Sequence, residues 1–306
     1  MEKPVLFRCF AFVFVGFFTL VLGWFQGDVL KVGGQAAVES EGRERTVRYS
    51  FVLKNGTNQT IRDVTFSAFA PVKETPFQSF QSITASAPFE LKSDGHGNQW
   101  LDFSLSEIGP YGDRVITVTA TVVMRSISSS ELPAFFDVIP VPWRTPSLDP
   151  WHPKVLGALQ SIGPVSNQSS ALDWLGRATM WVHSSIEDVG YVSRDLGAHY
   201  AIAERKGDCT EFMHALVELA RLNRLPAVAV AGFRASAGSQ LLEASDYHNW
   251  AMVYSGTGWF VSDPHANVFA SKQDEYIVFN LLDSSREQTN SQRFFSHDNR
   301  IMAAMH

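Results

Sequence analysis

The chain has 306 residues, of which 45% are hydrophobic and 18% charged. This length gives room for two domains with separate hydrophobic cores, and this composition excludes an intrinsically disordered protein. The formal net charge is -6, and the Lys and Arg residues form no cluster along the sequence. We therefore expect no nucleic-acid partner.

The N-terminal segment, residues 1–30, has the pattern of a signal sequence or a membrane anchor. Lys3 and Arg8 precede an uncharged, Phe-rich run from Cys9 to Phe25. A membrane-spanning helix needs ~20 apolar residues and a removable signal sequence only ~7–15, so this run has an intermediate length. No small-x-small cleavage site follows Phe25. The favoured interpretation is an uncleaved anchor with the rest of the chain on the exported side of the membrane, and cleavage stays an open alternative.

Residues 36–126 are predicted to form a β-sandwich domain of immunoglobulin-like type. Hydrophobic residues alternate with polar ones from Val47 to Leu53, and this run ends at Asn55-Gly56, a strong turn signal. The same alternation recurs in 99–105 and 115–123. Short alternating strands separated by turns, without helical periodicity, are typical of a sandwich of antiparallel sheets.

Residues 127–169 are predicted to be a linker. Prolines recur through this segment, from Pro133 to Pro164. Proline lacks the backbone N–H and interrupts a helix, so a long helix is excluded here. We expect an extended strap.

The remaining residues, 170–306, are predicted to form an α+β domain. Helical periodicity predicts a first helix over 171–186, capped by Ser169 or Ser170, and a second helix over 209–222. The apolar residues of the second helix fall on one face, and its charged residues are expected to face solvent: Glu211, Glu218 and Arg221. A valine-rich run over 227–233 predicts a central strand. The tail after residue 284 is expected to add a final strand or to contact a partner.

A hairpin is predicted after this strand, with its turn centred on Gly256-Thr257. This turn sets Trp250 opposite Asp263. His248 then lies diagonal to Asp263 on the same face of the hairpin, because side chains alternate along a strand. A slip of one residue would put the two side chains on opposite faces.

Cys209 combines with this hairpin into a candidate catalytic site. It follows Asp208, the predicted cap, at the start of the second helix. The free N–H groups and the positive dipole end of a helix N-terminus stabilise a thiolate. In this interpretation Cys209 is the nucleophile and His248 is the general base and later the general acid. Asp263 orients the imidazole and stabilises its charged form.

Acyl transfer also requires hydrogen-bond donors for the oxyanion of the tetrahedral intermediate. The backbone N–H of Cys209 is expected to be the first donor. The indole N–H of Trp250 and the hydroxyl of Tyr191 are candidates for the second, and the choice between them stays open.

Residues 170–266 resemble the core of the transglutaminase-like superfamily, which is related to the papain-type thiol enzymes. The matching motifs are Arg205-Lys206-Gly207-Asp208-Cys209, Leu225-Pro226-Ala227, Gly232-Phe233, His248-Asn249-Trp250 and Gly258-Trp259-Phe260-Val261-Ser262-Asp263-Pro264. The resemblance implies a core of helices packed against an antiparallel sheet. It also places the Cys-His-Asp triad of the family on Cys209, His248 and Asp263. A β-sandwich ahead of such a core, behind an anchor, resembles the architecture of bacterial envelope members.

The implied reaction is acyl transfer from a peptide or protein amide through a thioester on Cys209. Bacterial members resemble peptidases or amidases more often than cross-linking enzymes, and the residues leave open whether water or an amine accepts the acyl group. Asn249 stands where the family often has Ala, so it is a candidate for substrate contact. No acidic loop with alternating oxygen ligands appears, so neither calcium nor another cofactor is expected.

Two other interpretations are compatible with these residues. A metal site would use Cys209, His214, His248 and His265. However, His214 lies about 140° from Cys209 around a helix of ~3.6 residues per turn, so the two side chains do not readily face one ion. The other interpretation is a non-catalytic peptide- or glycan-binding envelope protein that keeps the fold. The unsubstituted triad argues against it.

Overall fold

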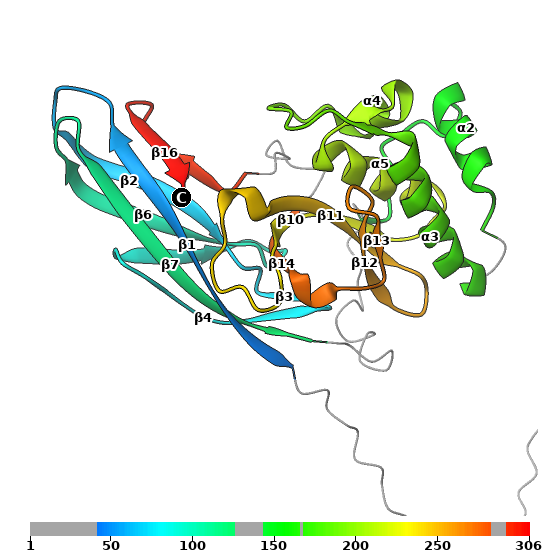
Figure 1. Ribbon diagram of the computed structural model, residues 1–306, viewed down its shortest axis with the longest axis horizontal. Helices are drawn as coiled ribbons and strands as arrows, with labels where there is room; N and C mark the ends of the chain where they lie inside the picture. The colour runs from blue at the N-terminus through cyan, green and yellow to red at the C-terminus, as the bar shows by residue number, and fades with distance from the viewer. Residues whose placement is uncertain (1–41, 126–142, 166–167, 283–291) are drawn as a thin grey trace, which may run out of the picture. The chain divides into compact units, whose positions relative to one another are not determined.

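The computed structural model describes residues 42–125, 143–165, 168–282 and 292–306 (Figure 1). These residues have an α+β fold, with two five-stranded antiparallel sheets, one four-stranded antiparallel sheet and a two-stranded parallel pair. The anchor predicted in residues 1–30 lies outside the described residues. Within the described ones, no helix is long and apolar enough to cross a bilayer.

Two of the antiparallel sheets enclose one hydrophobic core. Their strands are β1 (Arg43–Asn55), β2 (Ile61–Ala70), β3 (Glu74–Thr75), β4 (Gln78–Ala85), β5 (Phe89–Ser93), β6 (Gln99–Ile108), β7 (Asp113–Met124), β15 (Phe294–Ser296) and β16 (Ile301–Met305). The sheet orders are β16-β1-β7-β4-β3 and β15-β2-β6-β5. The alternating hydrophobic residues from Val47 to Leu53 point into this core, as predicted. The immunoglobulin-like type of this sandwich stays a prediction.

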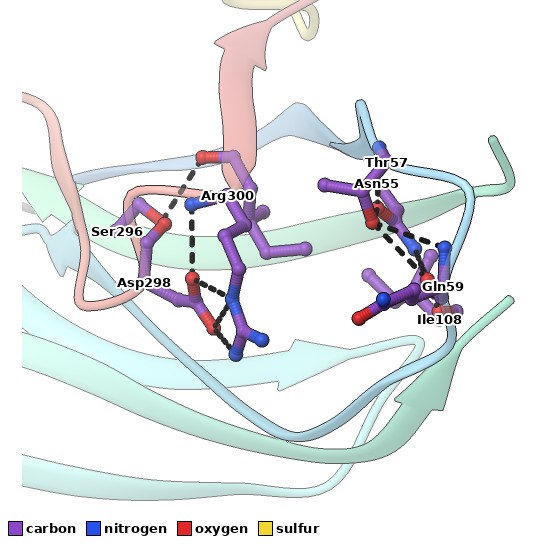
Figure 2. A network of polar contacts seen from close by, with 8 residues as sticks. Asn55, Thr57, Gln59, Ile108, Ser296, Asp298 and Arg300 are labelled. Atoms are coloured by element: carbon purple, nitrogen blue, oxygen red, sulfur yellow. Dashed lines mark hydrogen bonds and ion pairs between the residues drawn. The ribbon is translucent and has the colours of Figure 1, made fainter. Parts of the chain in front are cut away.

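The C-terminal tail contributes one strand to each of these sheets. β15 pairs with β2, and β16 pairs with β1. Figure 2 shows how the turn between them is held: the Arg300 guanidinium donates to Asp298 at 2.6 and 2.9 Å. In the same view, the buried Asn55 amide at the end of β1 donates to the carbonyl oxygens of Gln59 and Ile108. The tail therefore adds strands, one of its two predicted roles, and these strands join the sheets of residues 43–124.

The third antiparallel sheet has the order β13-β12-β11-β10-β14. Its strands are β10 (Ala227–Arg234), β11 (Tyr247–Tyr254), β12 (Trp259–Asp263), β13 (Val268–Phe269) and β14 (Tyr276–Leu282), and short 3-10 turns lie at Ala244–Asp246 and Gln273–Glu275. The face toward the helices carries small residues such as Ala229 and Ala231, which let a helix pack closely. The other face buries Trp250 and Met252 against Val72 of the sandwich. As predicted, β10 is an inner strand.

The helices gather on one side of this sheet (Figure 1). They are α2 (Pro153–Ile162), α3 (Gln168–Ser185), α4 (Gly197–Glu204) and α5 (Cys209–Leu222), and the short strands β8 (Glu187–Asp188) and β9 (Lys206–Gly207) form the parallel pair. The predicted bounds of α5 are confirmed. α3 begins at Gln168, three residues before the predicted start at 171, so Ser169 and Ser170 are helical residues and not its N-terminal boundary.

The extended strap predicted for the linker contains the helix α2, so the prediction is wrong over residues 153–162. Pro153 lies at the first position of the helix, where a missing N–H costs no hydrogen bond. Val155, Ala158 and Ile162 then follow at helical spacing and are buried. The sequence therefore does carry a start signal and an apolar stripe here, despite the many prolines around them.

The charged residues of α5 are buried, so the prediction that they face solvent is wrong. Glu211, Glu218 and Arg221 are 0%, 4% and 3% exposed. Glu218 and Arg221 form an ion pair at 3.1 Å. Glu218 also accepts hydrogen bonds from the backbone N–H groups of Ser147 and Leu148, because residues 147–148 cover this face of the helix.

β14 is an edge strand whose free side is covered by two side-chain amides from the sandwich. Gln78 donates to the carbonyl of Val278 at 3.0 Å and accepts from its N–H at 2.9 Å. Asn98 does the same for Leu281 at 3.1 and 2.7 Å. Both amides are buried. They take the place of a neighbouring strand and satisfy the edge.

Candidate active site

The first turn of α5 is fixed by a capping box around Cys209. Asp208 Oδ1 accepts from the N–H of Thr210 at 2.8 Å, and Glu211 Oε2 accepts from the N–H of Asp208 at 3.1 Å. Gly207 is required at this position because a Cβ would overlap the Glu211 side chain as it turns back. The predicted cap, Asp208, is confirmed. The capping box also explains why a glycine and an aspartate directly precede Cys209.

The same two carboxylates hold the preceding loop against the helix. Asp208 Oδ2 accepts from the N–H of Val192 at 2.9 Å, and Glu211 Oε1 accepts from the N–H of Leu196 at 2.8 Å. Burial raises the pKa of Glu211, although the N–H groups that it binds act in the opposite direction. Consequently the loop that carries Tyr191 is fixed beside Cys209.

The predicted register of the hairpin is confirmed. Tyr254 pairs with Trp259 across its turn, and the ladder continues to Ala251 and Ser262. His248 Nε2 therefore meets Asp263 Oδ2 at 2.8 Å, as the diagonal placement required.

Gly232 of β10 lies directly opposite His248. A Cβ at this position would overlap the Trp250 ring and the carbonyl of Ile277. This glycine therefore lets the indole pack beneath the histidine, at 6.5 Å between ring centroids.

Asp263 is fully buried, and the hydrogen bonds that it accepts stabilise its ionised carboxylate. Its Oδ2 accepts from the Tyr276 hydroxyl at 2.8 Å, and its Oδ1 accepts from the N–H of Ala266 at 3.0 Å. Desolvation raises the pKa of Asp263, but these hydrogen bonds and His248 outweigh it, so the pKa lies below its ordinary value. Tyr276 lies on β14, and no sequence motif identified it as part of the site.

His248 contacts both other members of the predicted triad. Burial alone would lower the pKa of its imidazolium, but hydrogen bonds and charge interactions with Asp263 and Cys209 raise this pKa to about 9. Since Nε2 faces Asp263, Nδ1 is the nitrogen left for the Cys209 thiol. The three residues thus lie in one chain of contacts, while their catalytic role stays a prediction.

The pocket beside Cys209 has a volume of about 280 Å³. Asn249 lines it and donates from Nδ2 to Thr210 Oγ1 at 3.2 Å. Tyr191 lines it and is 88% exposed. Trp250 is fully buried and is not part of the lining, and its indole N–H has no partner among the described residues.

One wall of this pocket comes from the C-terminal tail, which the sequence did not indicate. Gln292 and Arg293 both line the pocket. The Arg293 guanidinium lies over the Tyr247 ring at 5.1 Å and donates to the carbonyl of Ala244 at 3.0 Å. The Tyr247 hydroxyl in turn donates to the carbonyl of Gln292 at 3.2 Å. The tail and the hairpin therefore form this wall together.

The other histidines of the alternative metal site each face a carboxylate of their own. His214 Nε2 lies 3.0 Å from Asp195 Oδ2, and His265 Nε2 lies 3.1 Å from Asp188 Oδ2. Among the described residues, no three His, Cys, Asp or Glu side chains are grouped so as to hold a metal ion.

Comparison with protein families confirms the resemblance over one part of the chain. Residues 163–264 match the model of the transglutaminase-like superfamily. No curated protein sequence matches the chain.

Several solved structures are similar to the chain at low sequence identity. A "Putative Cysteine Protease" from Cytophaga hutchinsonii has 15% identity and a TM-score of 0.48, over 86% of this chain and 90% of that one. The periplasmic domain of TgpA from Pseudomonas aeruginosa has 15% identity and a TM-score of 0.34, over 72% of this chain and 88% of that one.

Proposed function

We propose that this chain, which carries a domain of the transglutaminase-like superfamily in residues 163–264, is a thiol-dependent acyl-transfer enzyme acting on amide bonds of peptides or proteins. The observation that supports this most directly is the position of His248. Its imidazole contacts the Asp263 carboxylate on one side and the Cys209 thiol on the other. A thiol, an imidazole and an orienting carboxylate in series are the groups that nucleophilic acyl transfer requires.

In the proposed reaction, the Cys209 thiolate attacks the amide carbonyl carbon and forms a C–S bond. The tetrahedral oxyanion collapses, the C–N bond breaks, and the His248 imidazolium gives its proton to the leaving amine. Water or a second amine then attacks the thioester carbon while neutral His248 accepts its proton. The C–S bond breaks, and thiolate and imidazolium are restored.

The contacts at the start of α5 support the backbone N–H of Cys209 as the first oxyanion donor. Asp208 accepts from the next two N–H groups of the helix, whereas the Cys209 N–H makes no hydrogen bond within the described residues. For the second donor, the exposed Tyr191 hydroxyl is better supported than the indole of Trp250, because the indole is sealed in the core.

We also propose that the enzyme works on the exported side of a membrane. The support is the uncharged run from Cys9 to Phe25 behind Lys3 and Arg8. Fractionation of cells that produce the full chain, with protease added from outside, tests this. If residues 42–306 stay protected from the added protease after the layers outside the cytoplasmic membrane have been permeabilised, the proposal is contradicted.

Thiol labelling tests the catalytic proposal. A Cys9→Ser background leaves Cys209 as the one thiol of the chain. With iodoacetamide at pH 7, we expect Cys209 to react at least about tenfold faster in the folded protein than in urea, because the thiolate is the reacting form. His248→Ala should remove this acceleration. His96→Ala, in a turn of the sandwich, is the matched control and should keep it. Equal rates in folded and unfolded protein would contradict the proposal and favour a non-catalytic binding protein.

A further inference from the structure

A second pocket lies where the sandwich meets β14 and the C-terminal tail. Its volume is about 480 Å³. Three aromatic side chains line it: Phe69, Trp100 and Phe295. The rings of Phe69 and Phe295 are packed edge to face at 5.5 Å. Such a concave site with aromatic walls and a few polar groups is the usual form of a small-molecule site.

Asn280 is the polar group in this pocket that lacks a partner. The residue is only 7% exposed, and its side chain lines the pocket. The Asn280 side chain makes no hydrogen bond with the described residues, whereas the neighbouring Asn98 amide is satisfied on both its nitrogen and its oxygen. The Asn280 amide is therefore open toward the pocket, where water or a ligand can meet its donors and its acceptor.

The other polar groups of the pocket are held in place by one another. The Ser67 hydroxyl donates to Asp102 Oδ1 at 2.6 Å and contacts His297 Nε2 at 2.9 Å. Lys92 lies outside the lining and forms an ion pair with Asp102 at 2.8 Å. These contacts fix the hydroxyl, the carboxylate and the imidazole in a preorganised row beside the aromatic rings.

The lining excludes several ligand classes. Asp94 and Asp102 line the pocket, and none of the described residues that line it is Lys or Arg, so a phosphate or a nucleic acid would meet like charge. An extended peptide would need a free strand edge, yet the N–H and C=O of Leu281 are already bound by Asn98. A wholly apolar ligand would leave Asn280 unpaired.

We infer that this pocket binds a neutral saccharide. A pyranose ring has an apolar C–H face, which suits the aromatic walls, and its hydroxyls both donate and accept hydrogen bonds. The Asn280 amide offers a donor and an acceptor side by side, which matches two neighbouring hydroxyls. The pocket is lined by none of the residues around Cys209, so this site binds a glycan independently of the thiol chemistry.

Titration calorimetry on the detergent-solubilised full chain tests this inference, with chitotetraose, cellotetraose and maltotetraose as probes. We expect at least one probe to bind with a dissociation constant at or below about 1 mM. Asn280→Ala and Trp100→Ala should each weaken this binding at least about tenfold, equivalent to ~1.4 kcal/mol. Trp100→Phe keeps an aromatic face and should retain most of the affinity.

Two controls separate this site from folding and from the active site. Asn280→Asp keeps the side-chain shape and removes both donors, so it should also weaken binding while the unfolding temperature stays near that of the parent chain. Cys209→Ala should bind the probe unchanged, whether or not the thiol is catalytic. The inference is overturned if none of the three probes binds saturably, or if binding is equal in the parent chain and all the Asn280 and Trp100 variants.

Discussion

The two ends of α5 each bury charged side chains, but they use them differently. At the N-terminal end, Asp208 and Glu211 accept hydrogen bonds from backbone N–H groups of the helix and of the preceding loop. At the C-terminal end, Glu218 and Arg221 form an ion pair that binds residues 147–148 and the start of β10. The first arrangement positions a thiol beside a pocket. The second fastens separate segments of chain to one helix.

This contrast teaches that buried charge alone does not identify a functional site. Both ends contain carboxylates that are almost fully buried and satisfied. Only the N-terminal end places a nucleophile next to an imidazole and an open pocket. We therefore expect substitutions at one end to change reactivity and substitutions at the other to change stability.

Cys209→Ser should have the largest effect, on activity alone. Loss of the nucleophile should lower amide turnover by at least about 10⁴-fold, as in other enzymes that use a covalent triad. Because the hydroxyl fits the same site, the unfolding temperature should stay within a few degrees. The measurement is turnover of a peptide substrate found with the active chain, together with calorimetry. Full activity in this variant would contradict the catalytic role assigned to the N-terminal end of α5.

Glu218→Ala should have the largest effect on stability. It removes the carboxylate that pairs with the buried Arg221 and that accepts from the Ser147 and Leu148 N–H groups. We expect the free energy of unfolding to fall by about 3–5 kcal/mol. Urea unfolding measures this loss.

The matched double variant is Glu218→Gln with Arg221→Met, which removes both charges and should recover part of the stability lost in Glu218→Ala. The rate of Cys209 labelling at 25 °C should stay unchanged in both variants. A variant that remained fully stable but lost labelling of Cys209 would contradict the structural role assigned to the C-terminal end of α5.

The pH dependence of stability and of turnover should follow the protonation of His248. Its pKa is raised from 6.5 to about 9, so its stabilising contribution is fully present below pH 6.5 and is lost as the pH rises through about 9. The stability difference between the parent chain and His248→Gln should therefore shrink above that pH. Turnover should fall about tenfold per pH unit above about 9, because the imidazolium is the proton donor to the leaving amine. A rate that stays level to pH 11 would oppose this role.

Of the four predicted effects, that of Tyr276→Phe should be the smallest. It removes one hydrogen bond to the Asp263 carboxylate at a cost of about 1.5 kcal/mol, which corresponds to about a tenfold loss of turnover at most. Without this donor the carboxylate is more basic, so the alkaline limb set by His248 should move upward by less than about one pH unit. Tyr254→Phe, which removes a hydroxyl at the hairpin turn, is the control and should leave the profile in place.

The local parts of the candidate site were predictable from the sequence. The turn at Gly256-Thr257 and the alternation of side chains place His248 and Asp263 on one face, and the structure has this register. Helical periodicity after Asp208 likewise gives the bounds of α5. In each case the decisive interactions lie within about fifteen residues of one another along the chain.

The parts that depend on distant segments were not predictable in this way. Periodicity assigns Glu218 to the solvent face because the segment that covers it lies some seventy positions earlier in the sequence. Tyr276 reaches Asp263 from another strand, and Arg293 reaches the pocket from the tail. No local pattern encodes these contacts, since they arise only when the sheets assemble.

The pairing of Gln78 and Asn98 with β14 has a consequence for dissecting the protein. A fragment that begins at residue 143 would lose both amides and leave the main-chain groups of Val278 and Leu281 exposed along one side of the sheet. Such an open strand recruits another copy of itself, so the isolated fragment should self-associate and precipitate as its concentration rises. Gln78 and Asn98 thus keep the edge of the sheet next to Cys209 from pairing with another copy of the chain.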